Sequence, residues 1–176
     1  MATAGADERL DPIDDAYRRR VSERSDGMSE RSAGDGDERF DLERFVRAQD
    51  DGDTIGTALR ELRRGRKTSH WMWFVFPQLA GLGMSAMSQR FAIVSLAEAR
   101  AYLAHPVLGP RLRECMTVVA ESSAASAAAL FGGIDATKAR SSATLFLRAA
   151  PDEPVFQQVL DRYFDGAADS ATDRLL

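Results

Sequence analysis

The chain has 176 residues, of which 44% are hydrophobic, and this is enough for one globular domain with its own core. The net charge of −4 falls on residues 1–39, with seven arginines against eleven acids, so the neutral remainder has no net attraction for nucleic acid or an anionic membrane. The single cysteine, Cys115, excludes an internal disulfide and a cysteine-cluster metal site. No apolar run approaches the ~20 residues that span a bilayer, and no signal peptide is visible, so we expect a cytoplasmic protein.

The N-terminal segment differs sharply in composition from the rest. Residues 1–38 are rich in Asp, Glu, Arg, Ser and Gly and contain few large apolar side chains. Such a segment buries too little surface to offset its ordering entropy, so the composition predicts an acidic disordered tail. A single domain is predicted over residues 39–176.

Helical periodicity begins after Phe40. A first helix is predicted from its N-cap Asp41 to Gln49, and Asp50-Asp51-Gly52 breaks it. A second helix is capped by Asp53 or Thr54 and ends at Gly65.

The next segment is less regular. Trp71–Phe76 is apolar on every face, which is typical of either a buried helical turn or a short strand, and Pro77 ends it. Gln78–Gln89 carries two glycines and several small residues, and we predict a loop there.

Further helices follow along the second half of the chain. Ser95 and Glu98 form a capping box that opens a helix to about Ala104. The remaining helices are predicted over a stripe from Leu108 to Val119 that includes Cys115, over 126–131, from the cap Asp135 to Leu147, and from Asp152 or Pro154 to Gly166. About seven helices without a convincing strand predict a compact, multihelical all-α domain.

Common catalytic and cofactor motifs are absent from the sequence. It contains no phosphate-binding glycine loop, no HExxH and no nucleophile-elbow serine. The two histidines are far apart, and no acidic cluster accompanies them, so we expect neither a metal nor a cofactor.

The segment Lys67–Gln78 is the first candidate site. Lys67, His70 and Gln78 offer polar groups beside Trp71 and Trp73, and aromatic walls with a few polar groups are typical of small-molecule pockets. The alternative is that the rings belong to the core and that His70 bonds to a backbone carbonyl.

Two further segments concentrate polar residues. His105 ends one helix, where the dipole favours a cation, and Arg111 lies near the start of the next. The favoured interpretation of this corner is a stiff helix connection, and a ligand site is the alternative. In the third segment Asp135 is the expected cap. Lys138, Ser141 and Thr144 make its helix unusually polar, so its hydroxyls either bond back to carbonyls or line a polar cavity.

These segments together resemble a bacterial family of unknown function, DUF 1810, over residues from about Phe40 to Leu176. The resemblance is carried by Phe45 with Ala48-Gln49, Ala58-Leu59-x-Glu61-Leu62, Gly65-x-Lys67, His70-Trp71-Met72-Trp73-Phe74-x-Phe76-Pro77-Gln78-Leu79, His105-Pro106-Val107-Leu108-Gly109-x-Arg111-Leu112, Phe131-Gly132-x-x-Asp135-x-x-Lys138 and Ser141-Ser142-x-Thr144-Leu145-Phe146. It implies a compact multihelical fold and no established activity. Some members carry the name calpastatin, but nothing in this sequence supports protease inhibition. A weaker similarity is to YbiA-like N-glycosidases, whose Trp-x-x-Glu-His arrangement this chain lacks.

Two hypotheses of function follow, beside a third in which all three segments only pack. The first is a small-molecule site for a nucleotide or ADP-ribose-like ligand, with or without catalysis. Lys67 and Arg111 would bind its phosphate, and Trp71 or Trp73 would stack on its ring. His70, Glu98 or Asp135 would transfer protons if a reaction is catalysed. The second is a non-enzymatic scaffold domain whose exposed aromatic face binds a protein partner of unknown identity.

Overall fold

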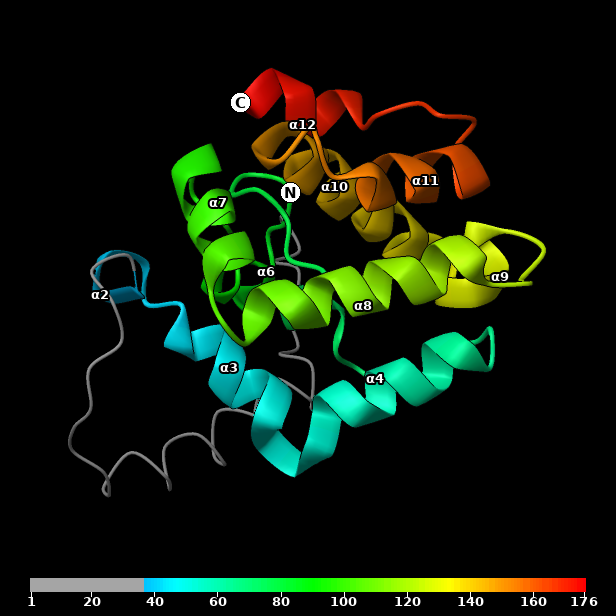
Figure 1. Ribbon diagram of the computed structural model, residues 1–176, viewed down its shortest axis with the longest axis horizontal. Coiled ribbons are helices and arrows are strands. Elements are labelled where there is room, and N and C mark those ends of the chain that lie inside the picture. Colours follow the sequence, from blue (N-terminus) through cyan, green and yellow to red (C-terminus); the bar gives the residue numbers. More distant parts are fainter. Residues whose placement is uncertain (1–36) are drawn as a thin grey trace, which may run out of the picture. The chain divides into compact units, whose positions relative to one another are not determined.

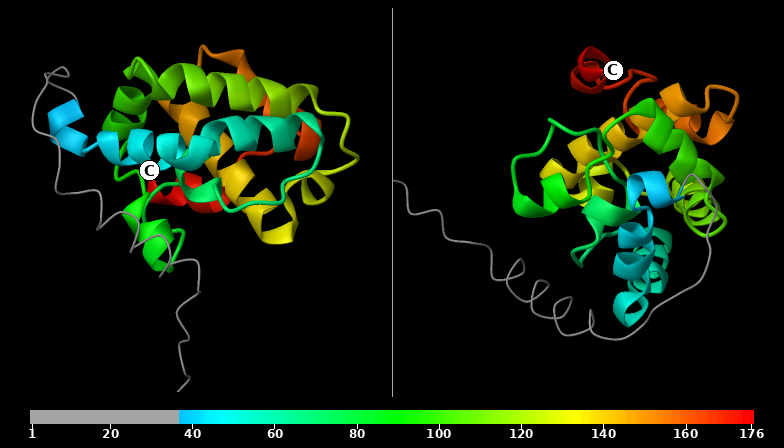
Figure 2. Two further views of the ribbon diagram at one scale, coloured as in Figure 1. Left: turned by 90° about the horizontal axis from the view of Figure 1, so that it is seen from below. Right: turned by 90° about the vertical axis from the view of Figure 1, so that its left-hand side faces the viewer.

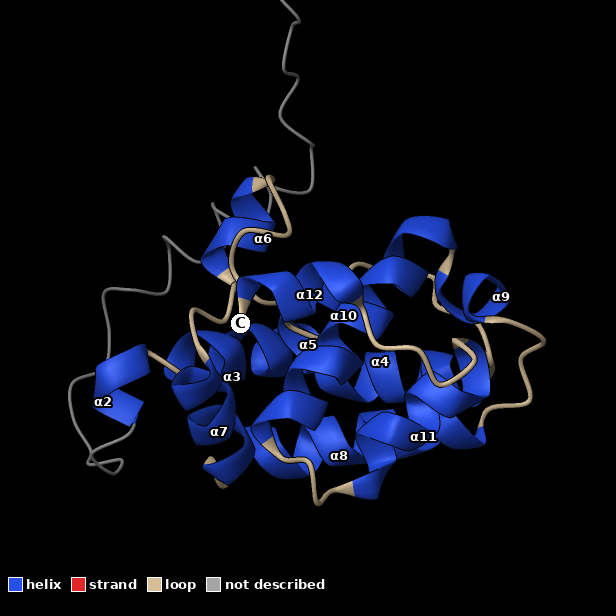
Figure 3. Cartoon of the chain, turned by 90° about the horizontal axis from the view of Figure 1, so that it is seen from above, coloured by secondary structure: helices blue, strands red, loops and turns tan. Residues whose placement is uncertain are grey.

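Every regular element among residues 37–176, the part of the chain that the computed structural model describes, is a helix (Figure 1). The predicted all-α class is therefore confirmed. Residues 1–36 of the predicted tail lie outside the described residues, and its last two residues begin the helix α2. Figure 3 shows helices joined by short loops. The helices are α2 (Asp37–Phe40), α3 (Glu43–Asp50), the 3₁₀ turn η1 (Asp51–Asp53), α4 (Thr54–Arg63), α5 (Met72–Val75), α6 (Ala86–Arg90), α7 (Leu96–Ala104), α8 (Leu108–Glu121), α9 (Ala127–Phe131), α10 (Gly133–Ala149), α11 (Pro154–Tyr163) and α12 (Ser170–Leu175).

The first two predicted helices exist, but the predicted cap of the first is wrong. Asp41 has a left-handed backbone (φ 48°) between α2 and α3, and the N-cap position of α3 is Leu42. Gly52 (φ 59°) breaks the chain between α3 and α4 as predicted, because glycine adopts this conformation without steric cost. Asp53 stands at the N-cap of α4, but its side chain makes no capping hydrogen bond.

The aromatic segment resolves into a single helical turn, α5, whose two flanking residues are also buried. The predicted loop over Gln78–Gln89 is partly wrong, because α6 begins within it. Ser85 caps α6 by accepting a hydrogen bond from the backbone N–H of Ser88 at 3.1 Å. An isolated parallel bridge between Leu79 and Ile93 joins the two ends of this region.

The capping box at the start of α7 is confirmed in part. Ser95 Oγ accepts from the backbone N–H of Glu98 at 3.2 Å, whereas the Glu98 carboxylate accepts from the N–H of Val94, one residue before the cap. The apolar stripe of α8 is confirmed, since Leu108 and Cys115 are fully buried. Figure 2 shows α8 running beside α4, and α8 also packs against α7 and α11.

Helix α10 lies at the centre of the domain, packed against α7, α9, α11 and α12 (Figure 1). Because these helices surround it, every residue from 141 to 147 is buried, including three hydroxyl side chains. Phe146 joins this helix to the aromatic core through Tyr102 and Phe156, with ring centroids 5.4 and 5.8 Å away. The helix that carries the third candidate segment is thus held on all sides. Among the described residues, no helix is long and apolar enough to cross a membrane.

Candidate functional site

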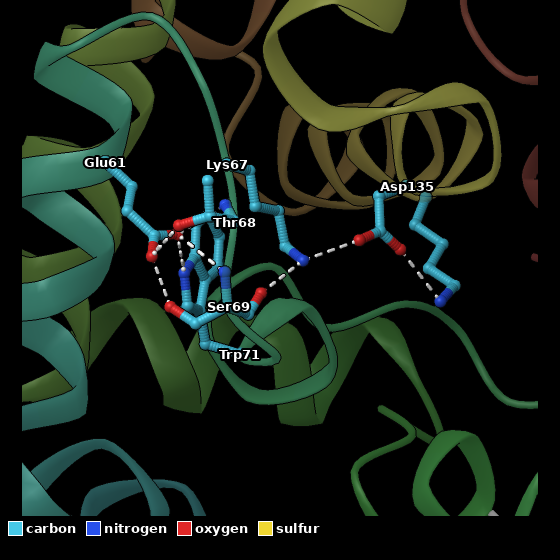
Figure 4. A network of polar contacts seen from close by, with 7 residues as sticks. Glu61, Lys67, Thr68, Ser69, Trp71 and Asp135 are labelled. Carbon is cyan, nitrogen blue, oxygen red and sulfur yellow. Dashed lines mark hydrogen bonds and ion pairs between the residues drawn. The ribbon is translucent and has the colours of Figure 1, made fainter.

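A buried carboxylate fixes the start of the aromatic segment. Glu61, on α4, accepts hydrogen bonds from the backbone N–H groups of Thr68 and Ser69 at 2.9 and 3.1 Å and from Trp71 Nε1 at 2.8 Å (Figure 4). The hydroxyls of Thr68 and Ser69 also donate to it. Burial raises the pKa of Glu61, but these five donors outweigh burial and hold that pKa at about 2. The segment that presents Lys67 and Trp71 is therefore anchored to α4.

Two lysines share one carboxylate on the other side of this segment. Lys67 Nζ lies 2.7 Å from Asp135 Oδ2, and Lys138 Nζ lies 3.0 Å from Asp135 Oδ1. Lys67 Nζ also donates to the carbonyl of Ser69 at 2.6 Å, as Figure 4 shows. The Lys67 side chain is only 7% exposed, whereas those of Asp135 and Lys138 are each 19% exposed. We call Lys67, Asp135 and Lys138 the lysine–aspartate triad.

The triad has one unbalanced positive charge at a partly exposed position. Burial raises the pKa of Asp135, but hydrogen bonds from Lys67 and Lys138 outweigh burial and keep this pKa below its usual range. Asp135 is therefore ionised at neutral pH. The predicted role of Asp135 as a helix cap is wrong, since the N-cap of α10 is Gly132 and the carboxylate faces the two ammonium groups instead.

Each lysine of the triad lies against a tryptophan. Lys67 Nζ is 5.0 Å from the ring centroid of Trp71, and Lys138 Nζ is 4.9 Å from that of Trp73. The two rings differ in access, because Trp71 is fully buried while Trp73 is partly exposed. Trp73 and Lys138 are therefore the ring and the ammonium group of this site that a ligand can approach from solvent.

These are also the only two lysines of the chain, whose other 21 basic residues are arginines. Lys67 and Lys138 stand far apart in the sequence, yet their ammonium groups reach opposite oxygens of one carboxylate. Elsewhere the fold uses arginine for ion pairs, as in Arg44–Glu98 and Arg113–Glu153. Both lysines of the chain therefore belong to the triad.

The second candidate segment has structural contacts of its own. His105 Nδ1 accepts hydrogen bonds from the backbone N–H groups of Val107 and Leu108 at 3.1 and 3.2 Å, and so satisfies donors at the start of α8. Arg111 pairs with Asp50 at 2.8 Å and donates to Gln49 at 3.3 Å, so its partners are on α3. These contacts match the favoured interpretation of this corner as a stiff helix connection.

The hydroxyls of α10 mostly bond back to the helix and to one acid. Ser141 and Thr144 donate to the carbonyls of Thr137 and Arg140, and Ser141 also donates to Asp169 at 2.9 Å. Asp169 in turn caps α12. Ser142 is fully buried, and its hydroxyl has no partner within the described part of the chain.

The remaining predicted residues lie outside the triad. His70 is exposed, and Gln78 is partly exposed with its backbone carbonyl accepting from Ile93 N–H at 2.8 Å. Glu98 is buried and pairs with Arg44 at 2.7 Å. Over residues 37–176 no three His, Cys, Asp or Glu side chains gather in a group suited to a metal.

Sequence reasoning missed Glu61 as part of the site. Its signal was its position, because Glu61 lies on the same helical face as Ala58 and Leu62, both of which are buried. An acid on a buried face requires donors, and here the following segment supplies five.

A family model and a solved structure both match this chain. The family model described as "Protein of unknown function (DUF1810)" matches residues 39–176. The crystal structure of the conserved hypothetical protein Rv1873 from Mycobacterium tuberculosis is similar, with 48% sequence identity and a TM-score of 0.76. That match covers 78% of this chain and 97% of the other. No curated protein matches the chain.

Proposed function

The chain belongs to the DUF1810 family, whose description names no activity, and from its site we propose that it binds a small anionic ligand with a flat ring, such as a nucleotide or an ADP-ribose-like compound. The observation that carries this proposal is the placement of Lys138, which lies over the partly exposed ring of Trp73 and shares the Asp135 carboxylate with Lys67.

The charge of the triad supports an anionic ligand. Two ammonium groups on one carboxylate leave an excess of one positive charge, and most of this group is shielded from water. Burying charged groups costs free energy. A buried cluster with one excess positive charge is therefore destabilising unless another anion neutralises that charge. A phosphate placed beside Lys138 would supply that charge.

The exposure of the two tryptophans supports one way for the ring to bind. Trp71 has no exposed surface and its Nε1 is bonded to Glu61, so Trp73 remains as the ring on which a base would stack. Lys67 already donates to Asp135 and Ser69, so Lys138 is the better partner for a phosphate. The alternative of a protein-binding aromatic face has less support, because it requires both tryptophans at the surface.

The test is thermal unfolding and tryptophan fluorescence with ATP, ADP-ribose or inorganic phosphate at millimolar concentration. A ligand present at 100 times its Kd stabilises the folded state by about 2.7 kcal/mol, which is a readily measured shift in Tm. We expect a shift with the nucleotides in the wild type, and its loss in K138Q.

R148Q is the matched control, since Arg148 is also on α10 but forms an exposed ion pair with Asp173. Binding should survive in R148Q. Absence of any shift, or an equal shift in K138Q, would contradict the proposal.

A further inference from the structure

We propose that Lys138 reacts with its ligand, forming an imine between its Nζ and the aldehyde of a phosphorylated sugar. This inference rests on the proposed function, because the same site must first hold the anionic ligand.

The triad uses lysine in a chain whose other basic residues are all arginines. A guanidinium stays protonated and pairs well with carboxylates, which is how Arg44 and Arg113 serve this fold. What lysine offers in addition is a primary amine that attacks carbonyl carbon. In a chain with 21 arginines, two lysines brought together on one carboxylate indicate a site where the amine itself is needed.

The surroundings distinguish the two lysines. Lys67 is 7% exposed, and both Asp135 and the Ser69 carbonyl accept from its ammonium group. Lys138 is 19% exposed and lies over Trp73, at the side of the triad that solvent reaches. Lys138 is thus the reacting amine, and Lys67 holds the other oxygen of Asp135 in place.

Asp135 is positioned to move the protons of this reaction. The carboxylate, 3.0 Å from Lys138 Nζ, takes one proton from the ammonium group and frees the nitrogen lone pair. Attack on the aldehyde carbon gives a carbinolamine, and Asp135 returns its one proton to the carbinolamine hydroxyl group, which leaves as water. In balance, one ammonium ion and one aldehyde give one protonated imine and one water. The positive charge stays on Nζ, so its ion pair with Asp135 is retained.

The ligand class follows from the same group of residues. The protonated imine leaves the excess positive charge of the triad unchanged, so a phosphate on the ligand is favourable before and after the reaction. The Trp73 face beside Lys138 suits the stacking of a sugar or base ring. A sugar phosphate whose ring opens to an aldehyde combines these groups, and ADP-ribose is one such compound.

The experiment is reductive trapping with sodium cyanoborohydride, with ribose 5-phosphate or ADP-ribose as the probe and mass spectrometry to locate the adduct. The experiment uses the variant R174K, in which a third, exposed lysine on α12 serves as a reference within the same folded molecule. We expect the adduct on Lys138 to form at least about tenfold faster than on the introduced lysine, since a bound probe is held near the amine. Excess AMP, which has no aldehyde, should compete and slow the labelling of Lys138 only.

Two results would overturn the imine. One is labelling of Lys138 no faster than the introduced lysine while ADP-ribose still raises Tm; this refutes the reaction and leaves binding intact. The other is a K138R variant that binds the probe and traps it at the wild-type rate. If ADP-ribose neither raises Tm nor traps, the proposed function fails as well.

Discussion

Replacing Glu61 by glutamine tests the anchor of the site. Glutamine has the shape of glutamate but no charge. Its NH₂ group is a donor, so in E61Q it faces N–H and O–H groups whose hydrogen bonds the carboxylate had accepted. The hydrogen bonds at Glu61 lower its pKa from the ordinary 4.5 to about 2 despite burial. Since one pKa unit is worth about 1.4 kcal/mol, the anchored carboxylate contributes about 3 kcal/mol to stability at neutral pH.

The dependence on pH makes this prediction specific. A carboxyl with a lowered pKa stabilises the fold above its ordinary value of 4.5, and this contribution is lost as pH falls toward 2. We therefore expect E61Q to cost about 3 kcal/mol at pH 7 and about 2 kcal/mol less than that at pH 3. The assay is urea unfolding followed by circular dichroism at both pH values.

The matched control is E114Q, because Glu114 forms an ion pair with Arg63 in which both side chains are more than half exposed. An exposed pair of this kind contributes about 1 kcal/mol or less. The explanation of the anchor is refuted if E61Q costs no more than E114Q, or if its cost is the same at pH 7 and pH 3.

Three further substitutions or treatments give distinct outcomes. D135N leaves the buried ammonium of Lys67 without its counter-ion and should cost about 3 kcal/mol in urea unfolding; a loss within error of zero would show that the triad is not formed. S142A removes a fully buried hydroxyl that has no partner among the described residues, so its unfolding free energy should be unchanged or slightly raised, and a clear loss would reveal an undetected bond. Cys115 is fully buried, which raises its thiol pKa to about 12, so at pH 8 it should resist a maleimide until urea unfolds the chain; rapid labelling of the native protein would contradict this burial.

Local signals in the sequence were sufficient for most of the helices. Ser95 begins α7, Ser126 caps α9 with a bond to the N–H of Ala129, and Gly52 separates α3 from α4. These features depend on residues within one turn of each other, so a single sequence contains them. The short helix α12 was missed because its cap, Asp169, follows a stretch without helical periodicity.

Tertiary contacts explain where the sequence predictions failed. Asp135 after two glycines has the pattern of a cap, but the distant Lys67, together with Lys138 one turn along the same helix, offers its carboxylate charged partners. The meeting of Lys67 with Lys138 depends on how α4, α9 and α10 pack, and no local pattern encodes that. The same is true of Arg111, which joins Asp50 rather than the aromatic segment.

The most direct test of the account is an NMR spectrum of protein labelled with ¹⁵N only in lysine, since Lys67 and Lys138 alone contribute side-chain ammonium signals. We expect D135N to move both signals, because both ammonium groups contact Asp135, and ADP-ribose to move the Lys138 signal in the wild type. Two signals that neither the substitution nor any nucleotide disturbs would contradict the central claim that the chain's lysines form one ligand site.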